Sequence, residues 1–484
     1  MPRSPSKSRI LLAVEALQRF DRDEAVRLLK EELSHGAADG ERWKSAGRLA
    51  AQIGEIEIAV EAARRYANTT PITLERLLFY WGELAHYGRT DAVRQDMRRL
   101  PQALQQHPIV QHFRGTLASQ VGDFVAAEEH YRAALAQTQY LPQTWFALSM
   151  FKTFTDSDPD LAAMERVRPA MATVDSSSRA RFLYGLAKAY HDLGDYDRAF
   201  AIYSEGAALR RKEEPWDRVQ VNRLADDLIQ DFTPEAMKRL TPSEEHRPAL
   251  FVNGLPRSGT TLVEQILVSN SRVADGGEVT LLKPALIPAG DHSLAGALAY
   301  QQRAGHDPWG AVARTYFRLL GARFPTDKLV VDKTLVQSHF MGLLMHTLPN
   351  ARVVWMRRNP EDTAFSCFRT FFTSNVPWSW SLDDIGFFFR LEDRLHAHWS
   401  AMFPDRILTV DYQALAADPE TWTAKIARHC GLEPEARMFE SHKTKRGVLT
   451  ASVQQVRSPI TTSRIGVSSR YSAHLEPFNR AYFG

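Results

Sequence analysis

The sequence has 484 residues, of which 44% are hydrophobic and 24% charged, a composition typical of a folded chain with two or three domains. A formal charge of +3 is too balanced for a protein whose main partner is a nucleic acid, and the two cysteines, Cys367 and Cys430, exclude a disulfide framework and a four-ligand zinc site. No apolar run is long enough to span a bilayer, and no cleavable leader is evident. We therefore expect a cytoplasmic protein without a membrane span.

The first half of the chain is predicted to be a helical repeat array over residues 8–225. Short turn signals separate amphipathic stretches, and the first four intervals between these signals are each 34 residues. The turn marks are Phe20, Gly54, Gly88, Gly122, Asp156 and Gly194. Small residues such as Gly47 and Gly115 lie seven positions before a mark, where they would let the two helices of a hairpin approach closely. An unrelated helical bundle is the alternative.

A turn-rich, charged stretch at residues 226–247 is interpreted as the junction to a second domain, residues 248–484. The apolar run 249–253 fits a buried parallel strand, and it is followed by a glycine loop, 254–261, and by helical spacing over 262–267. Strand, glycine loop and helix are the context in which backbone N–H groups and a helix N-terminus bind an anionic phosphate.

The glycine loop reads GLPRSGTT, with Arg257 inside it and Thr260 at the position that is lysine in nucleoside-triphosphatase loops. Without that lysine a kinase or other nucleoside triphosphatase is disfavoured, although it stays an alternative. PRSGTTL after a strand resembles the 5′-phosphosulfate-binding loop of sulfotransferases, which use 3′-phosphoadenosine-5′-phosphosulfate (PAPS) as sulfuryl donor. The resemblance implies donor binding by Arg257, Ser258, Gly259, Thr260 and Thr261.

A second motif follows two further predicted strands, at residues 329–334 and 351–356. Arg358 ends the second of these strands, and Ser366 lies eight residues later on a helix that we expect to begin at Pro360. This places both side chains within reach of one phosphate. Sulfotransferases use an arginine and a serine at this spacing for the 3′-phosphate of the donor. The alternative is a surface cation and a helix-surface hydroxyl.

The catalytic residues are implied by resemblance to one branch of this family. Small-molecule sulfotransferases carry a histidine two residues after the lysine that corresponds to Lys333, and here that position is Leu335. The segment ADGGE, which ends at Glu278, is similar to the glutamate-bearing loop of tyrosylprotein sulfotransferases. The resemblance implies that Glu278 is the general base, that Lys333 and Arg257 stabilise charge, and that Ser452 donates a hydrogen bond.

Each of these assignments has an alternative. Glu278 could be a capping or surface carboxylate, and Lys333 could form a strand-end salt bridge with Asp332. If Glu278 is not the base, His339 is the next candidate. Aromatic residues after the second motif could line an acceptor pocket or simply pack in a core: Phe371, Phe372, Trp378 and Trp380.

The repeats resemble the tetratricopeptide repeat, most clearly at residues 121–135 and 193–209, and the whole chain resembles bacterial proteins that fuse such repeats to a sulfotransferase domain. The expected fold is an α-helical tetratricopeptide-repeat solenoid followed by an α/β P-loop-like domain with a central parallel sheet. The expected reaction transfers a sulfuryl group from PAPS, without a metal, to a hydroxyl of a protein tyrosine, another peptide or a glycan. The array would bind a peptide or protein acceptor or form a homodimer. A non-catalytic scaffold is the remaining alternative.

Overall fold

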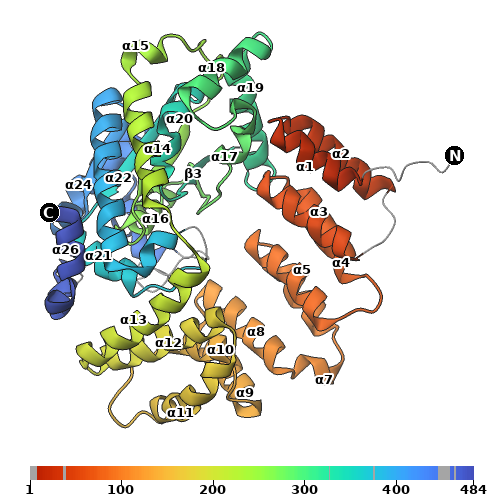
Figure 1. The fold of residues 1–484 in the computed structure, drawn as a ribbon, viewed down its shortest axis with the longest axis vertical. Coiled ribbons are helices and arrows are strands. Elements are labelled where there is room, and N and C mark those ends of the chain that lie inside the picture. The colour runs from red at the N-terminus through yellow and green to blue at the C-terminus, as the bar shows by residue number, and fades with distance from the viewer. Residues whose placement is uncertain (1–7, 36–39, 326, 374–375, 445–457, 463–464) are drawn as a thin grey trace.

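The structure is a computed structural model that describes residues 8–35, 40–325, 327–373, 376–444, 458–462 and 465–484. Figure 1 shows an arc of helices in the first half of the chain and a sheet surrounded by helices in the second half. None of the helices in these described ranges is both long and apolar enough to cross a membrane.

The first half consists of antiparallel helical hairpins, in which α1 packs on α2, α3 on α4, α5 on α6, α8 on α9 and α12 on α13. The apolar residues of these amphipathic helices pack in three successive hydrophobic clusters along the arc. The helices of this half are α1 (Arg9–Gln18), α2 (Arg22–His35), α3 (Gly40–Gln52), α4 (Ile56–Ala67), α5 (Leu74–His86), α6 (Thr90–Arg98), α7 (Gln102–Gln105), α8 (Pro108–Val121), α9 (Phe124–Gln137), α10 (Pro142–Ser149), α11 (Pro159–Val167), α12 (Ser176–Asp192), α13 (Tyr196–Glu213) and α14 (Arg218–Asp231).

Five of the six predicted turn marks have left-handed backbone conformations. The φ angles are 62° at Phe20, 78° at Gly54, 75° at Gly88, 83° at Gly122 and 79° at Gly194. A glycine adopts this conformation without steric cost, and it ends one helix before the next begins. The predicted helix–turn–helix boundaries at these positions are therefore confirmed.

One predicted close approach between paired helices is also present. A Cβ atom at Gly115 of α8 would lie 2.6 Å from the ring of Tyr131 on α9, so a larger residue there would force the hairpin open. Tyr131 is itself 2% exposed, which makes this contact part of the hairpin core. The small residue seven positions before the turn mark thus has the packing role that its spacing predicts.

The second half is built on a five-stranded parallel sheet with the order β2-β3-β1-β4-β5. The sequence predicted β1, β3 and β4, and all three are confirmed. The strand order reverses at β1, which has β3 on one side and β4 on the other. In open α/β sheets, ligands bind beyond the carboxyl ends of the strands at such a reversal of strand order. The strands are β1 (Ala249–Gly254), β2 (Val273–Asp275), β3 (Leu329–Asp332), β4 (Ala351–Arg357) and β5 (Ile407–Asp411).

Helices cover both faces of this sheet because alternate residues of each strand point to opposite sides. Leu250 and Val252 of β1 pack in the core that contains α16 and α24, whereas Ala249 and Phe251 pack in the core that contains α19, α20 and α22. The helices of this half are α15 (Pro234–Met237), α16 (Thr260–Val268), α17 (Leu282–Ala285), α18 (Leu294–Arg303), α19 (Pro308–Gly321), α20 (Met341–Thr347), α21 (Pro360–Phe368), α22 (Leu382–Met402), α23 (Tyr412–Ala417), α24 (Pro419–His429), α25 (Ala436–Phe439) and α26 (Glu476–Phe483).

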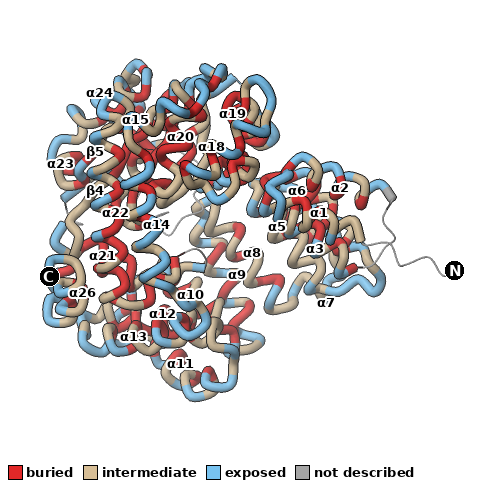
Figure 2. Tube along the Cα trace, turned by 45° about the horizontal axis from the view of Figure 1, so that its top comes forward, coloured by how far each residue is buried: buried red, intermediate tan, exposed pale blue. Residues whose placement is uncertain are grey.

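The end of the arc shares one hydrophobic core with the second half, and Figure 2 shows this buried region running from α12 and α13 into α21. The hydroxyl of Tyr184 on α12 donates a 3.0 Å hydrogen bond to the carbonyl of Phe368, at the end of α21. Phe371, Trp378 and Trp380 are buried in this core. These aromatic side chains therefore fill the junction between the halves, which agrees with the core alternative and not with an acceptor pocket.

The beginning of the arc makes a second contact, beside α19 (Figure 1). A Cβ at Gly54 would lie 3.1 Å from Leu319 and 3.2 Å from Leu281, so the turn between α3 and α4 packs directly on the second half. Next to it, the carboxylate of Glu55 accepts hydrogen bonds from Arg22 at 2.7 Å and from Arg318 at 2.6 Å. The arc is thus anchored at both of its ends.

Candidate functional site

The glycine loop, residues 254–261 and called the donor loop below, joins β1 to α16 at the carboxyl edge of the sheet. A Cβ at Gly254 would lie 2.8 Å from the carbonyl oxygen of Met356, and one at Gly259 would lie 2.8 Å from the ring of Tyr412. Both positions therefore require glycine. Helix α16 begins after Gly259, its N-cap residue, which has φ 108° and no side chain to cap the helix. The first-turn N–H groups of this helix provide a positive end of the kind that binds anions.

The backbone of the donor loop is strained at Arg257, whose φ of 68° is unusual for a residue other than glycine. Such strain costs on the order of 1–3 kcal/mol and is found most often at functional sites. The Arg257 Nε atom donates a hydrogen bond of 3.1 Å to the hydroxyl of Ser366 on α21. The strained loop thus directs its arginine toward the helix that carries the second motif.

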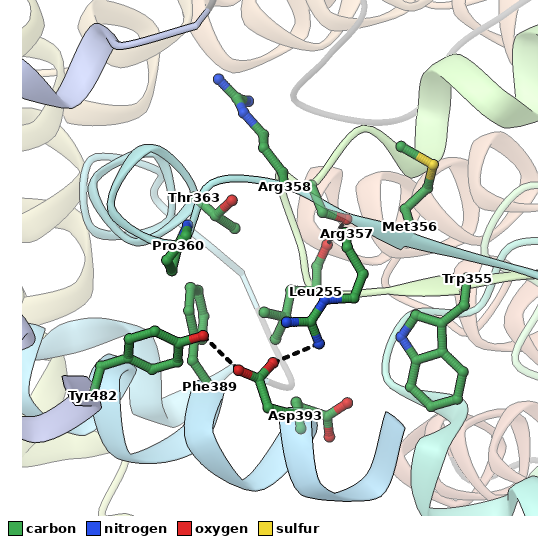
Figure 3. Close-up of a pocket in the computed structure, with 12 residues that line it drawn as sticks. Leu255, Trp355, Met356, Arg357, Arg358, Pro360, Thr363, Phe389, Asp393 and Tyr482 are labelled. Atoms are coloured by element: carbon green, nitrogen blue, oxygen red, sulfur yellow. Dashed lines mark hydrogen bonds and ion pairs between the residues drawn. The ribbon is translucent and has the colours of Figure 1, made fainter. Parts of the chain in front are cut away.

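The two arginines at the end of β4 point in different directions, as Figure 3 shows. Arg358 turns toward the donor loop, where its Nη1 atom donates to the carbonyl of Arg257 at 3.2 Å. Arg357 turns toward α22 and forms a 2.6 Å ion pair with Asp393, which also accepts a hydrogen bond from Tyr482. Of these neighbouring cations, Arg358 is the one that the structure brings to the predicted donor site, together with Ser366.

The space around Arg357 and Asp393 is narrow. It has a volume of about 20 Å³, which leaves room for about one water molecule and not for a nucleotide. Its lining includes Glu392, which is buried and accepts a hydrogen bond of 2.8 Å from Ser338. Burial raises the pKa of Glu392 to about 7. This region lies against the donor loop.

Two residues that the sequence interpretation missed hold the donor side together. Asp362, buried in the first turn of α21, accepts hydrogen bonds from the backbone N–H groups of Gly466 at 2.7 Å and Ser468 at 2.9 Å, which ties the C-terminal segment to this helix. Burial raises the pKa of Cys367 to about 12, so it is a neutral thiol, and its sulfur donates to the carbonyl of Pro256 at 3.2 Å. Nothing in the local sequence indicates these partners.

The predicted base, Glu278, and the predicted charge-stabilising Lys333 lie at the same edge of the sheet, beyond β2 and β3. Lys333 is 1% exposed, and its Nζ atom donates to Oε1 of Glu278 at 2.8 Å, while the Glu278 side chain is 44% exposed. The carboxylate of Asp332 instead accepts hydrogen bonds from Tyr316 at 3.1 Å and from Gln337 at 3.2 Å. The alternative that Lys333 pairs with Asp332 is therefore wrong.

Glu278 belongs to a loop over residues 276–281, called the base loop below. The backbone N–H of Lys333 donates to the carbonyl of Gly277 at 2.9 Å, and the N–H of Thr280 donates to the Thr334 hydroxyl at 2.8 Å. Thr280 has φ 51°, which is a genuine strain for a β-branched residue. The base loop is therefore held in one conformation against the end of β3.

The remaining predicted residues fall into three groups. Ser258, Thr260 and Thr261 are buried within the donor loop and the first turn of α16. Ser452 lies outside the described residues. His339 is partly buried, and burial lowers its pKa to about 4, so it is neutral at physiological pH and poorly matched to proton abstraction. Among the described residues, no group of three or more metal-ligating side chains lies together.

A family model described as "Sulfotransferase family" matches residues 248–436. An uncharacterised protein of Aquifex aeolicus (strain VF5) is 32% identical over 339 residues, which covers 66% of this chain and 43% of that protein. The match therefore spans less than half the length of that relative.

Solved structures with some likeness to the chain are bacterial sulfotransferases. One is the sulfotransferase domain of the Synechococcus PCC 7002 olefin synthase, with 16% identity, a TM-score of 0.29, and coverage of 48% of this chain and 98% of that chain. Another is sulfotransferase STF1 from Mycobacterium tuberculosis H37Rv, with 18% identity, a TM-score of 0.29, and coverage of 65% and 99%. The segment that matches the sulfotransferase family model, residues 248–436, contains the donor loop, the base loop and α21, and it follows the helical half.

Proposed function

We propose that this protein is a PAPS-dependent sulfotransferase that transfers a sulfuryl group to an acceptor hydroxyl. The observation that carries the proposal is the joining of the two donor motifs. Arg257 of the donor loop donates a hydrogen bond of 3.1 Å to Ser366, and Arg358 donates one of 3.2 Å to the carbonyl of Arg257. About 100 residues separate the two motifs in the sequence. Two guanidinium groups and a hydroxyl are thereby gathered beside an anion-binding helix N-terminus.

The residues of the donor loop fit a phosphosulfate group. The glycines at 254 and 259 let the loop pack directly against Met356 and Tyr412, and the first turn of α16 offers backbone N–H donors. Arg358 and Ser366 would hold the 3′-phosphate through charge-assisted hydrogen bonds. When bound, PAPS supplies the sulfuryl group, with its 5′-phosphate as the leaving group.

In the transfer step, we assign to Glu278 the role of the base that removes the proton of the acceptor hydroxyl. The acceptor hydroxyl oxygen bonds to sulfur as the bond between sulfur and the phosphate oxygen breaks, and Glu278 takes up the hydroxyl proton. Because Oε1 of Glu278 accepts from Lys333, Oε2 is the atom that we assign to the proton. Lys333 and Arg257 stabilise the negative charge that develops on the leaving phosphate. We expect no metal requirement, since the donor site is already cationic.

We further propose that the helical half is a tetratricopeptide-repeat array that binds the acceptor. The 34-residue spacing of the left-handed turns and the close packing of Gly115 on Tyr131 support this repeat type. Arrays of this kind present an extended surface for a peptide or protein. The acceptor would then be a hydroxyl of a peptide, with tyrosine as the first candidate.

The direct experiment follows sulfur-labelled PAPS with three acceptor classes: tyrosine peptides, glycans and small phenols. We expect transfer to at least one class, unaffected by EDTA. Transfer of the γ-phosphate of ATP in the presence of magnesium, with no transfer from PAPS, would contradict the proposal in favour of a kinase.

A further inference from the structure

The base loop is contacted from two sides, and one side belongs to the helical array. On the sheet side, Lys333 and Thr334 hold the loop by the bonds described above. On the opposite side lies Arg323, two residues beyond the end of α19. Its Nη1 atom donates to the carbonyl of Val279, the residue directly after Glu278, at 3.4 Å.

Arg323 is itself placed by a residue of the array. Its guanidinium lies 5.5 Å from the ring centre of Tyr87, in the turn between α5 and α6, and 5.3 Å from the ring centre of Phe324. Among the described residues, no carboxylate forms an ion pair with Arg323. A guanidinium over an aromatic face gains cation–π attraction, and this attraction is stronger when the pair is partly removed from water.

Charge and burial agree with this placement. Burial lowers the pKa of Arg323 below its usual value, while Tyr87 and the buried Asp332 act in the opposite direction. Arg323 therefore lies within electrostatic range of the residue that precedes Lys333, and within hydrogen-bonding range of the residue that follows Glu278. One cation thus lies near the sequence neighbours of both Glu278 and Lys333.

The repeat period explains why the array reaches this point. Gly54 and Gly88 are equivalent turn positions of successive hairpins, one period of 34 residues apart. The Gly54 turn packs on Leu281, at the end of the base loop, and Tyr87 beside Gly88 packs on Arg323. Since equivalent turns of stacked hairpins lie along one edge of an array, this edge covers the outer side of the base loop.

We propose that the array edge formed by the Gly54 and Tyr87 turns completes the active site, and that Arg323, oriented by Tyr87, is a positioning residue for Glu278. The strained backbone at Thr280 supports this reading, because a strained conformation persists only where its surroundings fix it from all sides. The proposal rests on the proposed function for its catalytic consequence. It adds a role for the array that is independent of acceptor binding.

The structural part of the test does not depend on the sulfotransferase reaction. Amide hydrogen exchange over residues 276–282 is compared in the wild-type chain and in the Tyr87→Ala, Tyr87→Phe and Arg323→Ala variants. Tyr140→Ala, an exposed array tyrosine, is the matched control. We expect faster exchange in Tyr87→Ala and Arg323→Ala and wild-type exchange in Tyr140→Ala. Tyr87→Phe, which keeps the ring, should stay close to wild type. Unchanged exchange in both alanine variants would overturn the proposal, even if the protein proves not to be a sulfotransferase.

The catalytic arm measures turnover and donor affinity separately. We expect Arg323→Ala and Tyr87→Ala to lower kcat about tenfold or more, because a small displacement of a catalytic group has effects of this size. The affinity for 3′-phosphoadenosine-5′-phosphate should stay unchanged, and Arg323→Lys should recover part of the loss.

A double variant decides whether Arg323 acts through Glu278. In a Glu278→Gln background, Arg323→Ala should cause no further loss of turnover, since the group that it positions has already been removed. An additional tenfold loss in that background would overturn the positioning role. Near-normal turnover in Glu278→Gln alone would instead contradict the proposed base, and the exchange experiment would still decide whether the array holds the loop.

Discussion

The donor side and the base loop lie at the same edge of the sheet, but different kinds of interaction fix them. The donor loop is fixed by its own backbone, with glycines at two crowded positions, and its polar side chains are buried. Glu278 is 44% exposed, and its loop is held by residues from β3, from α19 and, through Arg323, from the array. The comparison teaches that the proposed donor site is held by contacts within the second half of the chain, whereas the base loop is also contacted, through Arg323, by the helical half.

The largest effect is expected at Glu278. Glu278→Gln keeps the size of the side chain and its contact to Lys333 but cannot take up the acceptor proton. Turnover should fall by about 10²–10⁴, the usual contribution of a general base. Donor affinity measured by calorimetry should stay the same, which separates the two sides of the site.

Glu420→Gln is the matched control, because this carboxylate is exposed at the start of α24. It should leave turnover unchanged. A Glu278→Gln variant that loses donor affinity would break the comparison, because Glu278 would then belong to the donor side.

Lys333 should have the next largest effect. Lys333→Met removes a buried positive charge that we place at the leaving phosphate, and loss of one such stabilising group lowers kcat about 10²–10³ fold. Folding should be retained, because the freed Glu278 carboxylate is partly exposed and can be hydrated. The measurement is kcat together with the melting temperature, and an unchanged kcat would limit Lys333 to a structural role.

The neighbouring arginines offer a sharper contrast within the donor side. Arg358→Ala should weaken binding of 3′-phosphoadenosine-5′-phosphate about tenfold or more, as expected when one charge-assisted contact is lost. Arg357→Ala should leave that affinity unchanged and lower the melting temperature by a few degrees, since its partner is Asp393. The reverse pattern, with Arg357 controlling affinity, would contradict the orientation shown in Figure 3.

The smallest effect concerns stability rather than activity. Burial raises the pKa of Glu392 to about 7, above the value near 4.3 of an unfolded chain. The folded state therefore holds a proton that the unfolded state has lost, and this contribution to stability is full below about pH 4 and disappears as the pH rises to about 7. Glu392→Gln should remove this part of the pH dependence. Urea unfolding at pH 5 and pH 8 measures the change in the free energy of unfolding between these pH values. The same change in the variant as in the wild type would contradict the assignment.

The sequence signals of the donor loop and of the second motif are local. A strand, a glycine loop and a helix are each visible in a few consecutive residues, and the spacing of Arg358 and Ser366 spans only two helical turns. The hairpin turns at Gly54 and Gly88 were predictable for the same reason, since each repeats a short pattern. These features therefore needed no knowledge of tertiary contacts.

The supporting contacts could not be predicted, because their partners are distant in the sequence. The thiol of Cys367 meets the carbonyl of Pro256, and the ring of Tyr87 meets Arg323, across more than 100 and 200 residues. The sequence left the role of Trp380 open, because an aromatic residue near a motif fits both an acceptor pocket and a packed core. Its burial against the array decides for the junction.

The central claim, that the donor loop and α21 form a site for a 3′-phosphorylated nucleotide, has one direct test. Calorimetry compares 3′-phosphoadenosine-5′-phosphate with adenosine-5′-phosphate, which lacks only the 3′-phosphate, in the wild-type chain and in Arg358→Ala. We predict at least about tenfold tighter binding of the 3′-phosphorylated nucleotide by the wild type, and loss of most of this preference in the variant. Equal affinities in the wild type, or a preference that survives in Arg358→Ala, would contradict the account.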